Sequence, residues 1–469
     1  MTMADMAAES VVVGVGGRAA AEPTALLELV AKALADHGRT LVDITEVSTI
    51  DRRAGSEGVR LLGETTRAQL RAWPPDVLAR QPVETSSDTV AHHVGTPSVA
   101  EAAVLAAGAT PLGVAHRADG WVVVVGVRSG EPIPDLLHHG DTEVEPGMLD
   151  FAVNVHDSRP PDFLRKALTV AMEDLARYPD TRAATHAVAA AHGVPAECVL
   201  LTSGAAEAFT LVAQQPWQAP VVVHPQFTEP EAALLAAGHR VGRLLLTEAE
   251  DFRLTRSAPQ DADLVVVGNP TNPTSRLHCV DELTVLVSEN RLVLVDEAFM
   301  DTVEDVGTQE HSLAREAAHD PRLLVIRSLT KTYSIAGLRV GYVIGHPDRL
   351  TQLTSRRPPW PVSTLAAAAA IACVSEEGRA YAARVRAAQS GRLSPLADGL
   401  RRSGFVVPPE PRGPFLIGRH PDAAGIRNRL RTQRIAVRRG DTFPGLGSEW
   451  LRFAARDERA TDVLLKALG

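Results

Sequence analysis

The sequence predicts an α/β protein of two units joined by a linker. Apolar, β-branched runs recur in the second part of the chain, and each ends in small or polar residues, as in open sheets that bind ligands at their strand ends. A separate set of strand-like runs occupies residues 11–128, and a stretch rich in proline, glycine, histidine and acidic residues follows it. The length of 469 residues also exceeds the roughly 250–300 at which a single core stops growing. We expect domains at residues 1–130 and 150–469, with a linker over 131–149.

The first unit begins with an apolar run and a glycine turn over residues 10–17. The helix predicted next is amphipathic, with apolar positions at Leu26, Leu29, Val30, Ala33 and Leu34. Residues 48–53 and 94–103 follow, and a valine-rich run at 121–127 closes the unit. The glycines alone are too weak a pattern to predict dinucleotide binding.

Lys331 is the most informative residue of the second unit. Only four lysines occur among 48 basic residues, and an amine can lose its proton and form a Schiff base, whereas a guanidinium cannot. The apolar run at 323–327 places Lys331 just past a predicted strand end. The local pattern Ser-Leu-Thr-Lys is by itself more typical of a surface turn, and only the motifs that accompany it favour a functional lysine.

Three companions precede it in order. The run 199–202 leads into small residues that let a helix N-terminus face an anion. The run 264–268 enters a double Asn-Pro turn containing Asn272, whose amide can bond a ring oxygen. The run 292–295 ends in Asp296, a carboxylate that needs a cationic partner. Together with Lys331 these features meet the needs of pyridoxal phosphate.

These four motifs make the chain from about residue 150 to its C-terminus resemble the fold type I pyridoxal-phosphate enzymes, in the branch that contains histidinol-phosphate aminotransferase and threonine-phosphate decarboxylase. The resemblance covers about two thirds of the chain. It implies a large domain with a mixed, mainly parallel seven-stranded sheet, a small α+β domain, pyridoxal 5′-phosphate as cofactor and a homodimer.

The resemblance also implies roles for individual residues. Lys331 would bind the cofactor covalently, Asp296 would pair with its pyridine nitrogen, and Asn272 would bond its phenolic oxygen. The cofactor phosphate would be held by Ser203, Gly204, Ala205, Ser328 and Arg339, with Tyr178 reaching the phosphate of the neighbouring subunit. Phe227 either stacks on the cofactor ring or belongs to the core. The substrate would be contacted by Arg452 through its carboxylate, and by Arg438, Arg456 and Asn154.

The chain departs from the branch at two positions. Phe299 stands where many of these aminotransferases have tyrosine, so the hydroxyl that would bond the phenolic oxygen is missing and Asn272 must act without it. Ser275 replaces the glycine of the usual Asn-Pro-Thr-Gly turn, which leaves the role of Asn272 unchanged.

Residues 11–128 resemble a second family, the small α/β domain of cobalamin biosynthesis found alone or at the C-terminus of cobalt-precorrin lactone-opening enzymes. The resemblance rests on the segments at 48–58 and 94–109 and the final valine-rich strand, and it departs at Gly17 and at 118–120. A site lined by Asp51, Thr96, Ser98 and Glu101 is one reading of this domain, and a structural or tetrapyrrole-binding role is the equal alternative.

The fused domain and the segment 435–446 favour decarboxylation of L-threonine O-3-phosphate, which gives aminopropanol phosphate for cobalamin biosynthesis. The alternative is an aminotransferase acting on a phosphorylated amino acid or amino alcohol of the histidinol-phosphate type. A regulatory protein that senses pyridoxal phosphate ranks below both, because the first unit shows neither a helix-turn-helix pattern nor a basic stripe.

Composition limits the partners. The formal charge of −9 argues against nucleic acid. The three cysteines, Cys198, Cys279 and Cys373, lack metal or disulfide spacing, and we expect the histidine pairs at 92–93 and 138–139 to lie in solvated loops, so no metal site is predicted. The start of the chain lacks a charged region followed by an apolar one, and we therefore expect a soluble, cytoplasmic protein without a membrane partner.

Overall fold

The structure, a computed structural model, describes residues 10–18, 21–66, 68–83, 96, 98–128, 135–303 and 310–469. The chain divides into two compact units, Met1–Ile133 and Pro134–Gly469. None of the helices in these described ranges is long and apolar enough to cross a membrane.

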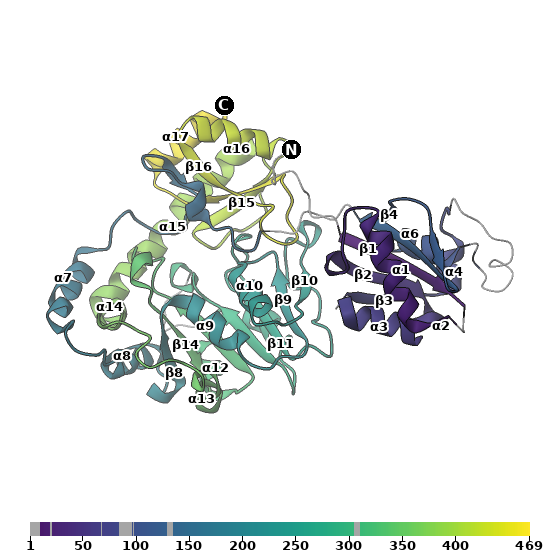
Figure 1. Cartoon of the computed structure of the whole chain (residues 1–469). Helices are drawn as coiled ribbons and strands as arrows, with labels where there is room; N and C mark the ends of the chain where they lie inside the picture. Colours follow the sequence, from purple (N-terminus) through teal and green to yellow (C-terminus); the bar gives the residue numbers. More distant parts are fainter. Residues whose placement is uncertain are drawn as a thin grey trace. The chain divides into compact units, whose positions relative to one another are not determined.

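The first unit is a twisted sheet with helices on both faces (Figure 1). Its strands are β1 (Ser10–Gly17), β2 (Ile44–Ile50), β3 (Gln69–Trp73), β4 (Thr110–Pro111), β5 (His116–Ala118) and β6 (Trp121–Arg128), in the order β3-β2-β1-β6-β4 with β5 also paired to β6. Its helices are α1 (Pro23–Ala35), η1 (Leu41–Asp43), α2 (Asp51–Ala54), α3 (Glu57–Thr66), α4 (Pro75–Ala79) and α6 (Val99–Ala106). Successive valines of β1 alternate between the faces, so that Val11 and Val13 pack with α1 while Val12 packs with α6. Of the four residues considered for a site here, Thr96 and Glu101 are buried, Ser98 is half-buried and Asp51 is exposed.

The core of the second unit is a seven-stranded sheet in the order β10-β9-β11-β12-β13-β14-β8. The strands are β8 (Val199–Thr202), β9 (Pro220–His224), β10 (Gly242–Leu245), β11 (Leu264–Gly268), β12 (Leu292–Asp296), β13 (Leu323–Ser328) and β14 (Gly341–Gly345). Neighbouring strands from β10 to β13 are parallel, and β14 runs antiparallel to both β13 and β8. The expected mixed, mainly parallel seven-stranded sheet is confirmed.

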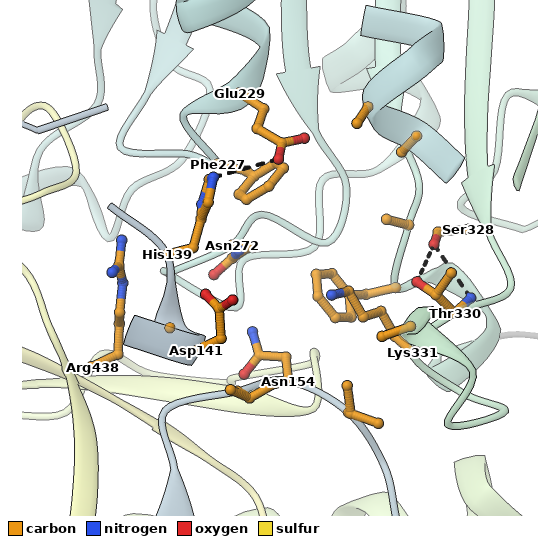
Figure 2. Close-up of a pocket in the computed structure, with 18 of the residues that line it drawn as sticks. His139, Asp141, Asn154, Phe227, Glu229, Asn272, Ser328, Thr330, Lys331 and Arg438 are labelled. Carbon is orange, nitrogen blue, oxygen red and sulfur yellow. Dashed lines mark hydrogen bonds and ion pairs between the residues drawn. The ribbon is translucent and has the colours of Figure 1, made fainter. Parts of the chain in front are cut away.

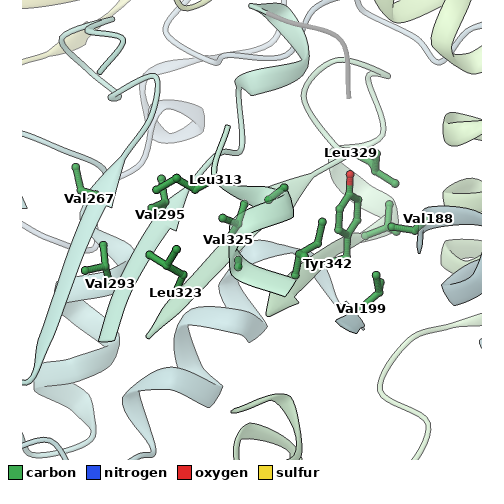
Figure 3. Packing of buried hydrophobic residues seen from close by; sticks show 14 of the residues in the cluster. Val188, Val199, Val267, Val293, Val295, Leu313, Leu323, Val325, Leu329 and Tyr342 are labelled. Atoms are coloured by element: carbon green, nitrogen blue, oxygen red, sulfur yellow. The ribbon is translucent and has the colours of Figure 1, made fainter. Parts of the chain in front are cut away.

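Both faces of this sheet are buried, which explains its almost unbroken apolar strands. Val293 and Val295 point to one face, where they belong to the cluster drawn in Figure 3. Leu292 and Leu294 point to the opposite face and pack with Phe209. The helices of this part of the chain are α7 (Asp162–Ala171), η3 (Met172–Asp174), α8 (Arg182–His192), η4 (Ala196–Cys198), α9 (Gly204–Ala213), α10 (Glu229–Ala236), η5 (Glu248–Glu250), α11 (Val280–Thr284), η6 (Met300–Thr302), α12 (Ala314–His319), η7 (Ala336–Leu338), α13 (Pro347–Thr354) and α14 (Thr364–Val374).

A smaller α+β part completes the second unit, as expected. The long helix α15 (Glu376–Arg402) connects the two parts, since Ala382 lies in the core beside the large sheet while Leu396 lies in the core of the small part. The small part contains β7 (Leu149–Phe151), β15 (Phe415–Arg419), β16 (Ile435–Arg439), β17 (Trp450–Ala454), α16 (Ala423–Thr432) and α17 (Glu458–Leu468). Its sheet has the order β15-β17-β16-β7.

The linker expected over residues 131–149 is corrected by the structure. Its first four residues lie outside the described part of the chain, and the rest belongs to the second unit. The Thr228 hydroxyl donates to the carbonyl of Leu136 at 2.6 Å, and a guanidinium N–H of Arg438 donates to the carbonyl of His138 at 2.6 Å. The absence of periodicity suggested a free linker, but side chains of the second unit supply partners for this irregular backbone.

We predict that a chain starting at Pro134 keeps the stability of the second unit, whereas a chain starting at Pro146 loses part of it. Glu143 is only 2% exposed and forms an ion pair with Arg427, so its deletion leaves a partly buried guanidinium unpaired at a cost of about 1–3 kcal/mol. Thermal unfolding followed by circular dichroism should give a lower Tm for the shorter chain. Equal Tm values would show that residues 135–145 are a free linker after all.

Candidate active site

A pocket of about 460 Å³ lies at the carboxyl ends of the central parallel strands. Asn272 follows β11, Asp296 ends β12, Ser328 ends β13, and Lys331 comes three residues later. All four side chains line the pocket, and Figure 2 shows Asn272, Ser328 and Lys331 around it. The structure thus brings together the residues that the sequence placed at separate strand ends.

The amine of Lys331 is buried near two positively charged side chains. Burial of the amine lowers its pKa, and the nearby guanidinium groups of Arg452 and Arg339 lower the pKa further, against smaller opposing effects of Glu229 and Asp141. A lysine with a lowered pKa is more often deprotonated near neutral pH, which is the form that attacks a carbonyl.

Asp296 is a carboxylate without a charged partner at this strand end. Burial, together with the smaller effects of the Glu229 and Glu297 charges, raises the pKa of Asp296 to about 7, while a hydrogen bond from the Ala298 N–H at 3.1 Å and the charge of Lys331 oppose the shift. Within the described ranges, no cationic side chain forms an ion pair with it. A protonated ring nitrogen placed here would supply the missing positive charge.

The phosphate-binding features gather at the start of α9 and the end of β13. Ala205 and Ala206 line the pocket, and the Ser328 and Thr330 hydroxyls lie 2.8 Å apart. Gly204 has φ +77°, and a Cβ there would lie 2.7 Å from a terminal nitrogen of Arg339. The backbone approaches the Arg339 guanidinium this closely only because residue 204 is glycine.

Asn272 is oriented by Arg452. A guanidinium N–H of Arg452 donates to the Asn272 side-chain oxygen at 2.7 Å, and Asn272 is only 8% exposed. Because its oxygen is engaged, the amide group of Asn272 is left to act as a donor in the pocket. This geometry fits a donor to a ring oxygen.

Arg438 and Arg452 form an unusual pair. They face each other directly across the antiparallel strands β16 and β17, and they are 2% and 4% exposed. Burial lowers the pKa of Arg438 to about 10 and also lowers the pKa of Arg452. Nη1 of Arg438 and Nε of Arg452 are buried without a hydrogen-bond partner. Like charges opposite each other are destabilising, so this pair creates a demand for anions in the pocket.

Three ionisable residues of the pocket were not predicted as site residues. His139 and Asp141 come from the supposed linker, and Glu229 begins α10. Figure 2 shows His139 beside Glu229, with the His139 Nε2 and Glu229 Oε1 atoms 3.5 Å apart. The expectation that the 138–139 pair lies in a solvated loop is corrected for His139, because the segment folds into the wall of the pocket. No periodicity in the sequence indicated this placement.

Other predicted residues are placed as follows. Phe227 lines the pocket, with its ring centroid 5.9 Å from that of His139. Asn154 also lines it and has a buried side-chain oxygen without a partner. Phe299 lines it too and packs edge-on against Phe415, with ring centroids 4.9 Å apart.

Four predicted residues do not line this pocket: Ser203, Gly204, Tyr178 and Arg456. Arg456 donates to the backbone carbonyls of Asp150, Val153 and Val155, each at 2.6 Å, so its expected substrate contact is corrected to a structural one. Ser203 lies just before α9, where its N–H donates to Glu207. Tyr178 is 76% exposed on the surface of the second unit.

The pocket fits pyridoxal phosphate as expected from the sequence. It offers an amine, a carboxylate without an ion-pair partner, a free amide donor and the start of α9 at Ala205 and Ala206 in one cavity. In the part of the chain that the structure describes, no group of three or more histidine, cysteine or acidic side chains is gathered as a metal site. His92 and His93 lie outside the described residues.

Comparison with known proteins gives matches to both units. Residues 146–468 match the family model of aminotransferase class I and II, and residues 11–125 match that of the cobalamin synthesis G C-terminus. A histidinol-phosphate aminotransferase of Mycobacterium tuberculosis is 46% identical over 332 residues, which are 70% of this chain and 89% of that protein. A threonine-phosphate decarboxylase of Salmonella typhimurium is 30% identical over 68% of this chain and 90% of its own length.

The fold is shared with solved structures. The crystal structure of a histidinol-phosphate aminotransferase from Clostridium acetobutylicum superposes with a TM-score of 0.62 at 23% identity, covering 68% of this chain and 97% of that chain. From its family model, its relatives and its fold, the chain belongs to the aminotransferase class I and II family, and it is an enzyme that uses pyridoxal 5′-phosphate.

Proposed function

We propose that this enzyme decarboxylates L-threonine O-3-phosphate to aminopropanol phosphate for cobalamin biosynthesis. The observation that carries the proposal is the buried pair Arg438 and Arg452, which requires a ligand with two anionic groups. L-Threonine O-3-phosphate has both a carboxylate and a phosphate. The cobalamin-type domain on the same chain supports the choice of this substrate.

The cofactor roles follow the geometry of the pocket. Lys331 would hold the cofactor covalently, Asp296 would pair with its ring nitrogen, and Asn272 would donate to its phenolic oxygen. Its phosphate would be held by the Ser328 hydroxyl, the Arg339 guanidinium and the backbone of Ser203, Gly204 and Ala205. When bound, pyridoxal phosphate withdraws electrons from a bond at the substrate Cα.

The protein selects the bond through the orientation of the substrate. Arg452 would bind the carboxylate, and Arg438 with His139 would bind the phosphate. Two anchors fix the direction in which the carboxylate leaves the Cα. Asn154 has a buried oxygen that would accept a hydrogen bond from the substrate. Lys331, with its lowered pKa, is suited to hold and return a proton at Cα.

A second function has its own support. The relative that is 46% identical is called a histidinol-phosphate aminotransferase, whereas the decarboxylase relative is 30% identical. An aminotransferase that uses glutamate as amino donor also binds two anionic groups, and the arginine pair would serve its two carboxylates. The two reactions therefore need to be separated by experiment.

The decisive measurement supplies L-threonine O-3-phosphate without any keto acid. We predict continuous release of CO2 and aminopropanol phosphate, because decarboxylation returns the cofactor to its starting form.

An Arg438→Met variant should raise KM at least tenfold, since loss of a charged partner costs about 1.5–3 kcal/mol. Arg439→Met is the matched control, because Arg439 is paired with Asp441 instead.

Two results would contradict these predictions. A single turnover that stops until 2-oxoglutarate is added, particularly with histidinol phosphate as amino donor, would establish the aminotransferase. An unchanged KM in Arg438→Met would remove the argument from the arginine pair.

Covalent attachment to Lys331 has a separate test. We predict that borohydride reduction followed by mass spectrometry places the cofactor adduct on Lys331, and that Lys331→Ala protein carries none, because no other lysine lines the described pocket. Lys166→Ala is the control, since Lys166 is exposed on α7. An adduct on Lys166 or another lysine in the Lys331→Ala protein would contradict the assignment.

We further propose a homodimer that uses the surface around Tyr178. The Tyr178 and Trp360 rings are 76% and 55% exposed and stack with centroids 4.3 Å apart. Exposed apolar side chains also occur nearby in sequence, at Val170, Met172 and Leu175. Exposed aromatic and aliphatic groups of this kind are typical of an interface.

Light scattering after size exclusion would test this surface. We predict that Trp360→Glu shifts the protein to a monomer, because it places a charge at the stacked pair. Val463→Glu is the control, since Val463 is also exposed, at 47%, but belongs to α17. A Trp360→Glu protein that remains dimeric would place the interface elsewhere.

A further inference from the structure

We propose that Arg327 is a positioning residue for the active site. Through a buried ionic network it holds the loop that follows Asp296 and contains Phe299 against the end of β13, which Lys331 follows by three residues. The inference rests on the roles proposed above for Asp296 and Lys331.

The network centres on the guanidinium of Arg327, which is 1% exposed. Its Nε atom lies 2.9 Å from Glu297 Oε2, and its Nη1 atom lies 2.8 Å from Asp301 Oδ1. Its Nη2 atom donates to the Ser312 hydroxyl at 3.2 Å. Glu297 also accepts hydrogen bonds from the Ser312 hydroxyl at 2.7 Å and from the Leu313 N–H at 2.9 Å.

The network begins where the regular sheet ends. The pairing of β12 with β13 ends at Asp296 and Ile326, and one more backbone bond joins the Glu297 N–H to the Ile326 carbonyl at 2.8 Å. Because successive side chains of a strand point to opposite faces, Glu297 and Arg327 lie on the face away from the pocket when Asp296 and Ser328 face it. The ion pair between Arg327 and Glu297 therefore joins the two chain segments where the backbone hydrogen bonds between β12 and β13 stop.

The position of Asp296 depends on this loop. Its carboxylate accepts a hydrogen bond from the Ala298 N–H, which belongs to the same loop. Phe299, the next residue, also lines the pocket. A shift of the loop would therefore move the partner of the ring nitrogen and a wall of the pocket together, relative to Lys331.

A buried ionic network contributes little net free energy to folding. Glu297 and Asp301 are 1% and 7% exposed, and the desolvation of such groups offsets most of their attraction to a guanidinium. A well-packed neutral set of the same volume is usually about as stable. Charged hydrogen bonds are directional, so they fix the positions of the groups that they join. We assign to Arg327 the role of fixing the loop after Asp296 in this way.

Three variants separate positioning from stability. Arg327→Met removes the guanidinium that pairs with the buried carboxylates of Glu297 and Asp301. The triple variant Arg327→Met/Glu297→Gln/Asp301→Asn removes all three charges together. Arg327→Lys restores one charge without the planar fork that reaches both carboxylates. Arg291→Met is the matched control, because among the described residues the buried Arg291 guanidinium binds only backbone carbonyls, those of Pro259, Ala262 and Leu286.

Three measurements apply to each cofactor-loaded protein: Tm, visible circular dichroism of the bound cofactor, and the Kd obtained by adding pyridoxal phosphate back to the stripped protein. We expect the triple variant to keep a near wild-type Tm, but to bind the cofactor about 10- to 100-fold more weakly, with an altered dichroism band. Arg327→Lys should fall between it and the wild type. Arg291→Met should lower Tm without changing the dichroism band.

The result that would overturn the proposal is a triple variant with wild-type Kd and dichroism, since the network would then be only structural. The same two measurements on Asp296→Asn distinguish the sources of failure. If Asp296→Asn changes them and the triple variant does not, the positioning role alone is refuted. If Asp296→Asn changes neither, the role proposed for Asp296 is refuted first.

Discussion

The active site depends on the parallel arrangement of β11, β12 and β13. Parallel strands end at one edge of a sheet, so residues separated by tens of positions in sequence become neighbours there. Asn272, Asp296, Ser328 and Lys331 all follow or end such strands. The apolar side chains that bury both faces of the sheet fix these strand ends, and the chemistry of the pocket is therefore anchored in the core.

The charge balance of the pocket is the second constraint. Lys331, Arg339, Arg438 and Arg452 line one cavity, and neither Arg438 nor Arg452 forms an ion pair with a carboxylate in the described ranges. The phosphate of the cofactor and the anionic groups of the proposed substrate would offset this repulsion. Asp296 is the converse case, a carboxylate whose raised pKa marks the place of a cation.

The sequence predicted those site residues whose position depends on a short stretch of neighbouring sequence. A strand, a turn and one chemically distinctive residue were enough to place Lys331, Asp296 and Asn272. It did not predict His139, because an aperiodic segment shows no sign of the backbone partners it will find in the folded chain. Nor does the sequence show which arginine lines the pocket. Arg438 and Arg456 were both expected to contact the substrate, but in the structure Arg438 lines the pocket and Arg456 donates to three backbone carbonyls. The role proposed for Tyr178 would depend on a second subunit, and its exposed position on the surface is consistent with that proposal.

Arg452 links the parts of the site to one another. It orients Asn272 by a hydrogen bond, faces Arg438 across the small sheet, and lowers the pKa of Lys331 by its charge. A substrate carboxylate bound to Arg452 would offset that charge, and the proton affinity of Lys331 would then rise when the substrate is in place. Lys331, which would hold the cofactor covalently until the substrate arrives, would then be better able to hold a proton. One guanidinium thereby couples substrate recognition to the protonation state of the lysine that both proposed reactions require.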